Sequence, residues 1–297
     1  MHILVVGGAG MIGGHAALYL QSQGHDVSIA GRNAPAAGTP LAALPFIKLD
    51  YIHDDMFPAG FDALVFTAGN DGRHMPADDS NDSYWHKANS EAVPRFFARA
   101  KAAGVTIAIN IGSFYPQVTP ELVSSNAYVA SRQASDLGVC ALNDEGFRAL
   151  SLNAPFVLGA VPGLVVPMFA AYTQYAQGKF APMPEFAPPG GVNFITCQSL
   201  SEAIAGALAR GEGGKSYLVG DENLSFQDYF GHFFDAVGRT IPPIVDEEHP
   251  MLPDSAIFAG RGNTVFYEPD AAETALLGYR RNDVRRAVDE IVAQNSQ

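Results

Sequence analysis

The feature that most constrains this chain is a set of spaced glycines that begins at its seventh residue. Gly7, Gly10 and Gly13 directly follow the apolar run Ile3–Val6 and lead into a helical pattern. Glycines at this spacing allow a tight turn, close approach of a ligand to the backbone, and close packing of a helix on a strand. Free N–H groups at the start of such a helix attract phosphate. The sequence therefore predicts a Rossmann-type α/β fold that binds a dinucleotide at this turn.

Short apolar runs alternate with helical patterns up to about residue 156. The runs contain many β-branched residues and no polar alternation, which is typical of strands buried on both faces of a parallel sheet. The runs are Ile3–Val6, Val27–Ala30, Phe46–Leu49, Ala63–Thr67, Val105–Ile111 and Ala149–Asn153, and helices are expected at Met11–Gln23, Asp82–Ala103 and Asn126–Asp144. This alternation predicts a doubly wound parallel sheet. The Ala-, Pro- and Gly-rich link between Arg32 and Phe46 predicts that the second crossover helix is short or missing.

The end of the second predicted strand indicates which dinucleotide is favoured. Rossmann proteins specific for NAD(H) usually have an acidic residue here, about 20 residues after the glycines, that binds the ribose 2′-hydroxyl. This chain has Gly31-Arg32-Asn33 instead. The Arg32 guanidinium can donate a planar pair of hydrogen bonds to a 2′-phosphate, so NADP(H) is favoured and NAD(H) stays an alternative. Arg32 as a solvated surface residue is the other interpretation. Asp50, at the end of the third strand, is either an adenine contact or an ordinary loop carboxylate.

The alternation of runs and helices loosens after residue 156, where prolines become frequent. We expect residues 1–156 to form the NAD(P)-binding Rossmann domain. Residues 157–297 are expected to form a smaller substrate-binding lobe, with some segments returning to the Rossmann sheet. Helices are expected in this half at Leu200–Arg210, Phe226–Val237 and Asp283–Ala293.

Three polar residues near the fifth strand form a candidate catalytic set. Ser113 follows the strand, and Tyr128 and Arg132 occupy positions i and i+4 of a helical stretch, where they share one face. This set resembles that of the short-chain dehydrogenase/reductase superfamily, in its extended or atypical, epimerase/dehydratase-like branch. The resemblance covers nearly the whole chain and includes Phe66-Thr67-Ala68-Gly69, Asn89, Asn153-Ala154-Pro155 and Tyr217-Leu218-Val219-Gly220-Asp221.

The resemblance implies a role for each of these residues. Tyr128 would be the general acid/base at the reacting carbonyl or alcohol, Ser113 would hydrogen-bond the same oxygen, and Pro155 would help to seat the nicotinamide. The family has a lysine where this chain has Arg132; that lysine binds the nicotinamide ribose and lowers the tyrosine pKa. A phenol that titrates at about pH 10 needs such a cation to act near neutrality. Arginine supplies the charge but cannot release a proton.

The arginine leaves three interpretations open: a working enzyme, a slow or specialised enzyme, and a cofactor-binding protein without catalysis. The catalytic residues expected from the sequence are Ser113, Tyr128 and Arg132. The expected cofactor contacts are Gly7, Gly10, Met11, Ile12, Gly13, Arg32, Asp50, Thr67, Ala68, Gly69 and Pro155.

The residues after the Rossmann half bear on the substrate. Lys179 is the only lysine or arginine between Ala149 and Ala209, whereas a nucleotide-sugar pyrophosphate calls for cations. Arg239 and Arg261 could still fold back into the cleft. The candidate lining is aromatic and aliphatic, and consists of Phe114, Tyr115, Phe156, Val157, Phe169, Tyr172, Phe180 and Phe186. Such a lining suits a small apolar carbonyl, unless these residues are plain core.

These observations lead to one main functional hypothesis and two alternatives. The main hypothesis is an NADP(H)-dependent oxidoreductase that reduces a small apolar aldehyde or ketone. The first alternative is an NAD(P)-dependent nucleotide-sugar epimerase or dehydratase. The second is a redox sensor that binds NADP(H) without catalysis. His74 and His86 flank the segment after the fourth strand and are weaker candidates for substrate contact.

Composition excludes several other functions. The net charge of −13, without a basic cluster, argues against binding to nucleic acid or an anionic membrane. Cys140 and Cys197 are expected to be reduced thiols, and the histidines lack metal-ligand spacing, so we expect no metal. The partner is expected to be a small-molecule substrate. A homodimer through the two helices near Asp82–Ala103 and Asn126–Asp144 is implied by the resemblance, and the location is expected to be cytoplasmic.

Overall fold

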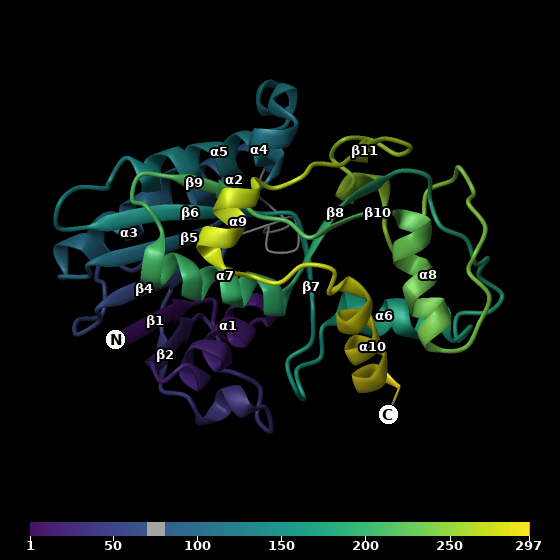
Figure 1. The fold of residues 1–297 in the computed structure, drawn as a ribbon, viewed down its shortest axis with the longest axis horizontal. Coiled ribbons are helices and arrows are strands. Elements are labelled where there is room, and N and C mark those ends of the chain that lie inside the picture. The colour runs from purple at the N-terminus through teal and green to yellow at the C-terminus, as the bar shows by residue number, and fades with distance from the viewer. Residues whose placement is uncertain (70–80, 297) are drawn as a thin grey trace.

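A sheet of seven parallel strands forms the centre of the computed structural model, which describes residues 1–69 and 81–296 (Figure 1). The strand order is β3–β2–β1–β4–β5–β6–β9. The strands are β1 (His2–Val6), β2 (Asp26–Gly31), β3 (Phe46–Lys48), β4 (Ala63–Phe66), β5 (Ile107–Ser113), β6 (Arg148–Ala154) and β9 (Ser216–Leu218). The order reverses between β1 and β4, which creates the crevice where doubly wound sheets bind ligands. The predicted Rossmann fold and its first six strands are confirmed.

Alternate residues of β1 enter two different cores. Ile3 and Val5 pack with α1 (Met11–Ser22) and α7 (Cys197–Arg210) on one face of the sheet. Leu4 and Val6 pack with α3 (Ala92–Ala102) on the other face, where α5 (Ala127–Cys140) also lies (Figure 1). A strand buried on both faces has no polar alternation, which is why these runs were readable in the sequence.

The predicted helices of this half exist with changed boundaries. The long helix expected over Asp82–Ala103 consists of α2 (Asn81–Trp85), a π-helical segment (His86–Glu91) and α3. Helix α5 ends at Cys140, before the expected end at Asp144. The link between β2 and β3 contains a single 3₁₀ turn, η1 (Pro40–Ala43), as its composition predicted.

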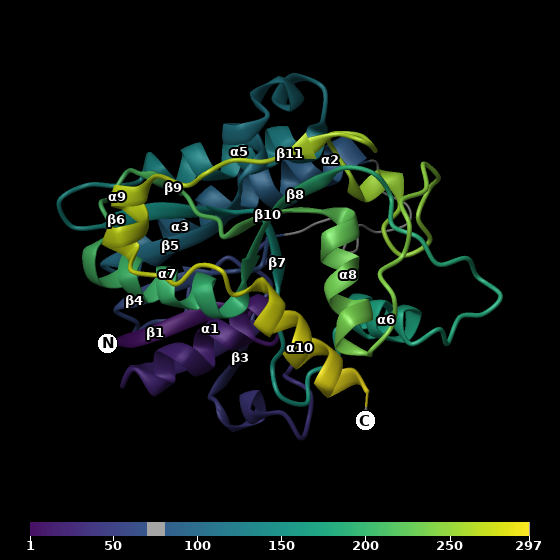
Figure 2. The ribbon, with the colours of Figure 1, turned by 45° about the vertical axis from the view of Figure 1, so that its right-hand side comes forward.

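A second, smaller sheet was missed by the sequence analysis. Its strands are β7 (Phe156–Leu158), β8 (Gly191–Thr196), β10 (Glu222–Ser225) and β11 (Thr264–Val265), with β8 at the centre. Helices α6 (Pro167–Ala176), α8 (Phe226–Ala236) and α10 (Val284–Asn295) pack beside it around an aromatic core (Figure 2). The described connections also include the short elements α4 (Tyr115–Val118), η4 (Pro120–Ser124), η5 (Asp254–Ala256) and α9 (Ala271–Leu277).

Segments from the second half also join the first sheet. Strand β9 pairs with β6, and α7 packs against α1. The chain therefore crosses between the two sheets several times after residue 157. The division into a Rossmann domain and a substrate lobe stays a prediction.

His249 lies at the centre of the aromatic core of the second half. The side chain is 0% exposed; its Nε2–H donates to the Phe186 carbonyl oxygen at 3.1 Å, and its Nδ1 accepts the backbone N–H groups of Met251 and Leu252 at 3.1 Å each. These partners define a neutral ring with the proton on Nε2. Burial lowers the pKa of His249 to about 4, against the opposing effect of the Phe186 carbonyl.

Cys140 and Cys197 are free thiols, and burial raises the pKa of Cys197 to about 12. Among residues 1–69 and 81–296, no three His, Cys, Asp or Glu side chains lie close enough together to hold a metal ion. None of the described helices is long and apolar enough to cross a bilayer.

Candidate active site

The glycine turn joins β1 to α1 at the carboxyl edge of the sheet. Gly7 has a φ of 85°, which glycine adopts without strain, and its carbonyl oxygen accepts the N–H of Gly10 at 3.0 Å. A Cβ on Gly13 would lie 2.4 Å from both the Gly7 carbonyl oxygen and Thr67 Oγ1. Only glycine therefore lets the first turn of α1, which includes Met11 and Ile12, approach the strand this closely. That turn presents N–H groups that have no intrahelical acceptor.

The segment after β4 is fixed to the same turn. The backbone N–H and Oγ1 of Thr67 both donate to the Val6 carbonyl oxygen, at 2.9 and 2.8 Å. From the other side, the Gly7 N–H donates to the Ala30 carbonyl oxygen of β2 at 2.8 Å. The ends of β1, β2 and β4 thus meet where the phosphates of a dinucleotide would lie.

Arg32 and Asp50 follow the ends of β2 and β3. Arg32 is exposed and has no hydrogen bond or ion pair within the described residues, so its guanidinium is free for a ligand. The Asp50 carboxylate is already engaged in its own loop, by His53 Nδ1 at 3.0 Å and the Ile52 N–H at 3.0 Å. Partial burial raises the pKa of Asp50, but these hydrogen bonds outweigh it and leave the pKa below its usual value. The adenine contact assigned to Asp50 stays a prediction.

Ser113, Tyr128 and Arg132 lie on neighbouring elements. Ser113 is the last residue of β5 and is buried. Tyr128 lies in the first turn of α5, which begins where the Asn126 side chain caps the Val129 N–H at 3.1 Å. Arg132 lies one turn further along α5. The i, i+4 spacing therefore directs Tyr128 and Arg132 to the end of the sheet where β5 stops.

The Arg132 guanidinium bridges the ends of β5 and β4. Its Nη2 donates to the Ile111 carbonyl oxygen at 2.6 Å, and a Cβ on Gly69 would lie only 2.1 Å from Nη1. The side chain is 6% exposed, and its Nε–H has no partner in the described structure. A buried, unpaired donor is costly, so it favours a bound acceptor such as a ribose hydroxyl.

These features fit a nicotinamide dinucleotide. Glycine Cα atoms at Gly7 and Gly13 allow the pyrophosphate to approach the helix N-terminus, and the unpaired Nε–H of Arg132 suits the ribose at the other end. Pro155 is buried just after β6, next to the same edge of the sheet.

Two aromatic residues beside Tyr128 were not found by sequence reasoning. The Phe258 ring stacks on the Tyr128 ring, with centroids 4.9 Å apart and an angle of 26° between the planes. Trp85 contacts the same ring edge-on at 5.3 Å. Tyr115, one of the expected lining residues, lies edge-on against Phe258 at 5.4 Å. No motif links Trp85, Tyr128 and Phe258, because they come from distant parts of the chain.

The remaining substrate-side expectations had mixed outcomes. Phe169, Tyr172 and Phe186 are almost fully buried in the core of the second half of the chain. The interpretation of these three residues as plain core is therefore correct. His86 is exposed and forms an ion pair with Glu91 at 3.1 Å. His74 lies outside the described residues.

The expected substrate-side arginines are compensated by carboxylates. Arg239 pairs with Glu185 at 2.8 Å, and Arg261 pairs with Asp246 at 3.4 Å and Asp254 at 3.2 Å. Neither guanidinium is therefore free to bind a pyrophosphate.

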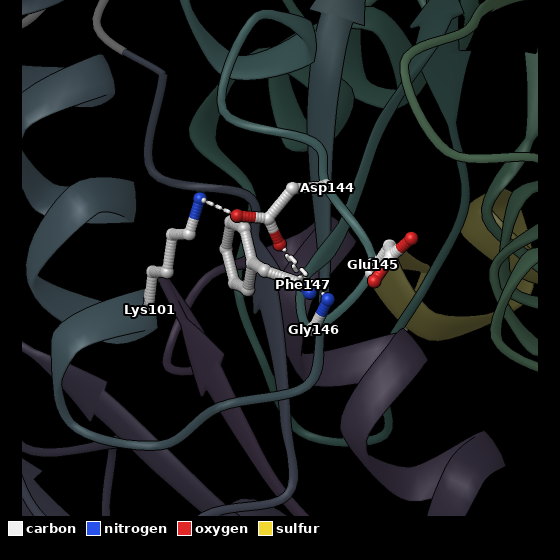
Figure 3. Close-up of a pocket in the computed structure, with 5 residues that line it drawn as sticks. All are labelled: Lys101, Asp144, Glu145, Gly146 and Phe147. Carbon is white, nitrogen blue, oxygen red and sulfur yellow. Dashed lines mark hydrogen bonds and ion pairs between the residues drawn. The ribbon is translucent and has the colours of Figure 1, made fainter.

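A hollow of about 480 Å³ lies at the opposite, amino edge of the sheet (Figure 3). It is lined by Lys101 at the end of α3 and by residues 144–147, which precede β6, and its main interaction is the Lys101–Asp144 ion pair at 2.6 Å. Ligands of doubly wound sheets bind at the carboxyl ends of the strands, so we do not assign this hollow to the site.

A doubly wound sheet with this glycine turn and with a Ser, Tyr and cation at the end of β5 defines a protein of the short-chain dehydrogenase/reductase type. The family model described as "NAD dependent epimerase/dehydratase family" matches residues 3–187, which is more than half of the chain. The chain belongs to this family, and it is an NAD(P)-dependent enzyme of the short-chain dehydrogenase/reductase type. No curated protein matches the sequence.

Solved structures share the whole fold at low sequence identity. The chain is similar to UDP-glucose-4-epimerase from Stenotrophomonas maltophila, solved with NAD and formylated UDP-arabinopyranose (TM-score 0.77, 17% identity, 100% of this chain and 98% of that one). It is also similar to UDP-glucose 4-epimerase from Bifidobacterium longum, solved with NAD⁺ and UDP (TM-score 0.75, 16% identity, 100% and 98% covered). A third similar structure is that of gox2253 (TM-score 0.76, 20% identity, 99% and 98% covered).

Proposed function

We propose that this enzyme interconverts an alcohol and a carbonyl by nicotinamide-dependent hydride transfer at Ser113 and Tyr128. The observation that carries the proposal is the convergence of three features at the carboxyl edge of the sheet. These are the glycine turn at Gly7–Gly13, the Ser113/Tyr128 pair, and the buried Arg132 guanidinium, which contacts Ile111 of β5 and lies beside Gly69.

Each of the three residues has a distinct task. The nicotinamide, when bound, supplies or accepts the hydride at the reacting carbon. The Tyr128 hydroxyl gives its proton to the carbonyl oxygen during reduction and removes the alcohol proton during oxidation. Ser113 donates a hydrogen bond that holds the same oxygen. Arg132 adds a fixed positive charge on the same face of α5, one turn after Tyr128.

The test of this function is a Tyr128→Phe variant, because phenylalanine keeps the ring and its contacts but removes the transferable proton. We expect turnover to fall by about 10²-fold or more, while cofactor affinity stays within about twofold. Tyr19→Phe, which changes a half-buried tyrosine in the second half of α1, is the matched control and should retain full activity. Full turnover of Tyr128→Phe would refute the proposal.

Within the NAD(P)-dependent class, we propose a preference for NADP(H). Supporting this, Arg32 is exposed after the end of β2 and has no hydrogen bond or ion pair within residues 1–69 and 81–296, and the sequence has Gly31-Arg32-Asn33 where NAD(H)-specific proteins have an acidic residue. Parallel titrations with NADPH and NADH, followed by nicotinamide fluorescence, measure the preference. Arg32→Glu is expected to weaken NADPH binding about tenfold or more and to spare NADH. Unchanged NADPH affinity in that variant would overturn the assignment.

Two substrate classes have support from different observations. The family match and the similarity to UDP-glucose 4-epimerases favour a nucleotide-sugar epimerase or dehydratase over the reduction of a free aldehyde. The second candidate, a small apolar aldehyde or ketone, is favoured by the aromatic rings around Tyr128 and by the pairing of Arg239 and Arg261 with carboxylates. An epimerase reoxidises its cofactor within each turnover, so it should convert UDP-glucose without net change in NAD(P)H absorbance. A carbonyl reductase should consume NAD(P)H in step with product.

A further inference from the structure

We infer that Phe258 is a specificity-determining residue, which makes this site select a flat, uncharged apolar carbonyl or alcohol and exclude a nucleotide sugar. The inference rests on the proposed function, since it takes Tyr128 as the reacting side chain. It concerns the substrate side of that site and chooses the second of the two substrate classes named above.

The Tyr128 ring is enclosed by aromatic rings from two other segments. Phe258 covers it by stacking at 4.9 Å, which is direct ring contact and leaves no space for a third ring between them. Trp85 packs its edge against the same ring at an angle of 73°. A substrate whose carbonyl reaches the Tyr128 hydroxyl must therefore lie alongside these rings. Apolar ring surfaces favour a flat apolar neighbour over a chain of hydroxyl groups, which they cannot hydrogen-bond.

The loop that carries Phe258 is built to hold the ring in place. Gly260 and Gly262 adopt φ values of 85° and 86°, and the Gly260 N–H donates to the Ile257 carbonyl oxygen at 2.8 Å. The side chain of Asn263 closes the loop by donating to the Ala259 carbonyl oxygen at 2.7 Å. This small, tightly turned loop connects η5 to β11 in the second half of the chain.

Tyr115 supports Phe258 from the α4 side. Its ring lies edge-on against the Phe258 ring, with the ring centroids 5.4 Å apart. Tyr115 in turn contacts Phe114, which stacks on Tyr267 at 5.9 Å. Ring contacts therefore extend from Trp85 to Tyr267. Among the described residues, Phe258 is the ring from the second half of the chain that contacts Tyr128 directly.

Charge near this loop is already balanced. Arg261, three residues after Phe258, is shared by Asp246 and Asp254. A pyrophosphate would have to compete with two carboxylates for this guanidinium, and the resulting repulsion disfavours a nucleoside diphosphate. An uncharged substrate meets no such cost.

The single tryptophan of the chain provides a direct binding assay. Because Trp85 contacts Tyr128, its emission reports on ligands that enter the site. We would titrate the full-length protein, with and without NADP⁺, with benzyl alcohol and separately with UDP-glucose. The variants are Phe258→Ala and, as matched control, Phe266→Ala, which removes a phenylalanine that is 43% exposed in the same half.

We expect benzyl alcohol to change Trp85 emission saturably, Phe258→Ala to weaken that binding about tenfold, and Phe266→Ala to leave it unchanged. UDP-glucose should bind the parent more weakly than benzyl alcohol does. The inference is overturned if benzyl alcohol does not bind, if UDP-glucose binds as tightly, or if the two variants behave alike. Failure of the proposed function looks different: benzyl alcohol would bind through Phe258, but Tyr128→Phe would leave turnover unchanged.

Discussion

Alanine substitutions at Gly10 and Gly13 distinguish the effect of the glycine turn on ligand binding from its effect on stability. A Cβ on Gly10 would meet only the Gly7 carbonyl oxygen, at 3.4 Å, which is an ordinary contact. The backbone of Gly10 is extended, with a φ of −91°, and alanine adopts it freely. The same methyl on Gly13 would lie 2.4 Å from both the Gly7 oxygen and Thr67 Oγ1. Gly10→Ala is therefore expected to affect only the ligand, whereas Gly13→Ala affects the protein itself.

The expected magnitudes differ accordingly. At Gly13 the two contacts fall about 1 Å short of van der Waals separation, and overpacking of this kind costs about 1–3 kcal/mol. This lowers the melting temperature by roughly 3 °C for each kcal/mol. At Gly10, under the proposed binding mode, the added methyl group would stand between the pyrophosphate and the N–H groups of α1. Loss of one charge-assisted hydrogen bond, about 1.5–3 kcal/mol, weakens NADPH binding by about 10- to 100-fold.

Two assays on the same proteins measure these effects. Thermal unfolding without cofactor should give Gly10→Ala the Tm of the parent and Gly13→Ala a lower one. Titration with NADPH should show weaker binding for both variants. If Gly10→Ala binds NADPH as the parent does, no pyrophosphate lies against this turn, and the assignment of the dinucleotide site is wrong.

Two further predictions concern Arg132 and His249. Gly69→Ala should lower kcat about tenfold or more with little change in Tm, because the added methyl group would displace the flexible end of Arg132. Nη1 of Arg132 lies 2.1 Å from the position of the added Cβ. An unchanged kcat would mean that the position of this guanidinium is unimportant for turnover. His249 should destabilise the fold in acid, because its folded pKa of about 4 lies below the unfolded value of 6.5, so the unfolded state takes up the proton first as the pH falls. The contribution of neutral His249 to the free energy of unfolding is fully present above about pH 7 and falls by about 2 kcal/mol by about pH 5. The free energy of unfolding, measured with urea, should therefore depend less on pH in His249→Gln than in His86→Gln. His86 is the control because its imidazole is exposed. Equal pH dependences of the two variants would refute the argument.

The strands and the glycine turn could be predicted because their causes are local. Val5, for example, is buried on one face and Val6 on the other, so every position of the strand is apolar. The glycine spacing likewise reflects contacts within one strand, turn and helix. Strand β9 was only anticipated as a returning segment, because Ser216–Leu218 is too short to show a pattern. The second sheet was missed for a related reason: β11 has two residues, and β10 is partly exposed throughout.

The site residues divide in the same way. Ser113, Tyr128 and Arg132 could be proposed as candidates because a strand end and an i, i+4 helical spacing are visible in one sequence, and the structure places them at the end of β5 and in α5. The direction of Arg132 toward Gly69 and Ile111 was not predictable, because it depends on where β4 ends relative to α5. The π-helical segment after Trp85 also left no sign in the sequence, although Trp85 itself reaches Tyr128.

The two sides of the site are built by different means, and this has a consequence for function. The cofactor side depends on backbone geometry in one continuous turn, which any sequence with the right glycines can reproduce. The substrate side that we propose depends on side chains brought together from α2, α5 and the loop before β11. A single change, such as Phe258→Ala, can alter the second without disturbing the first. The family match therefore carries the cofactor class, but not the substrate, over to this chain.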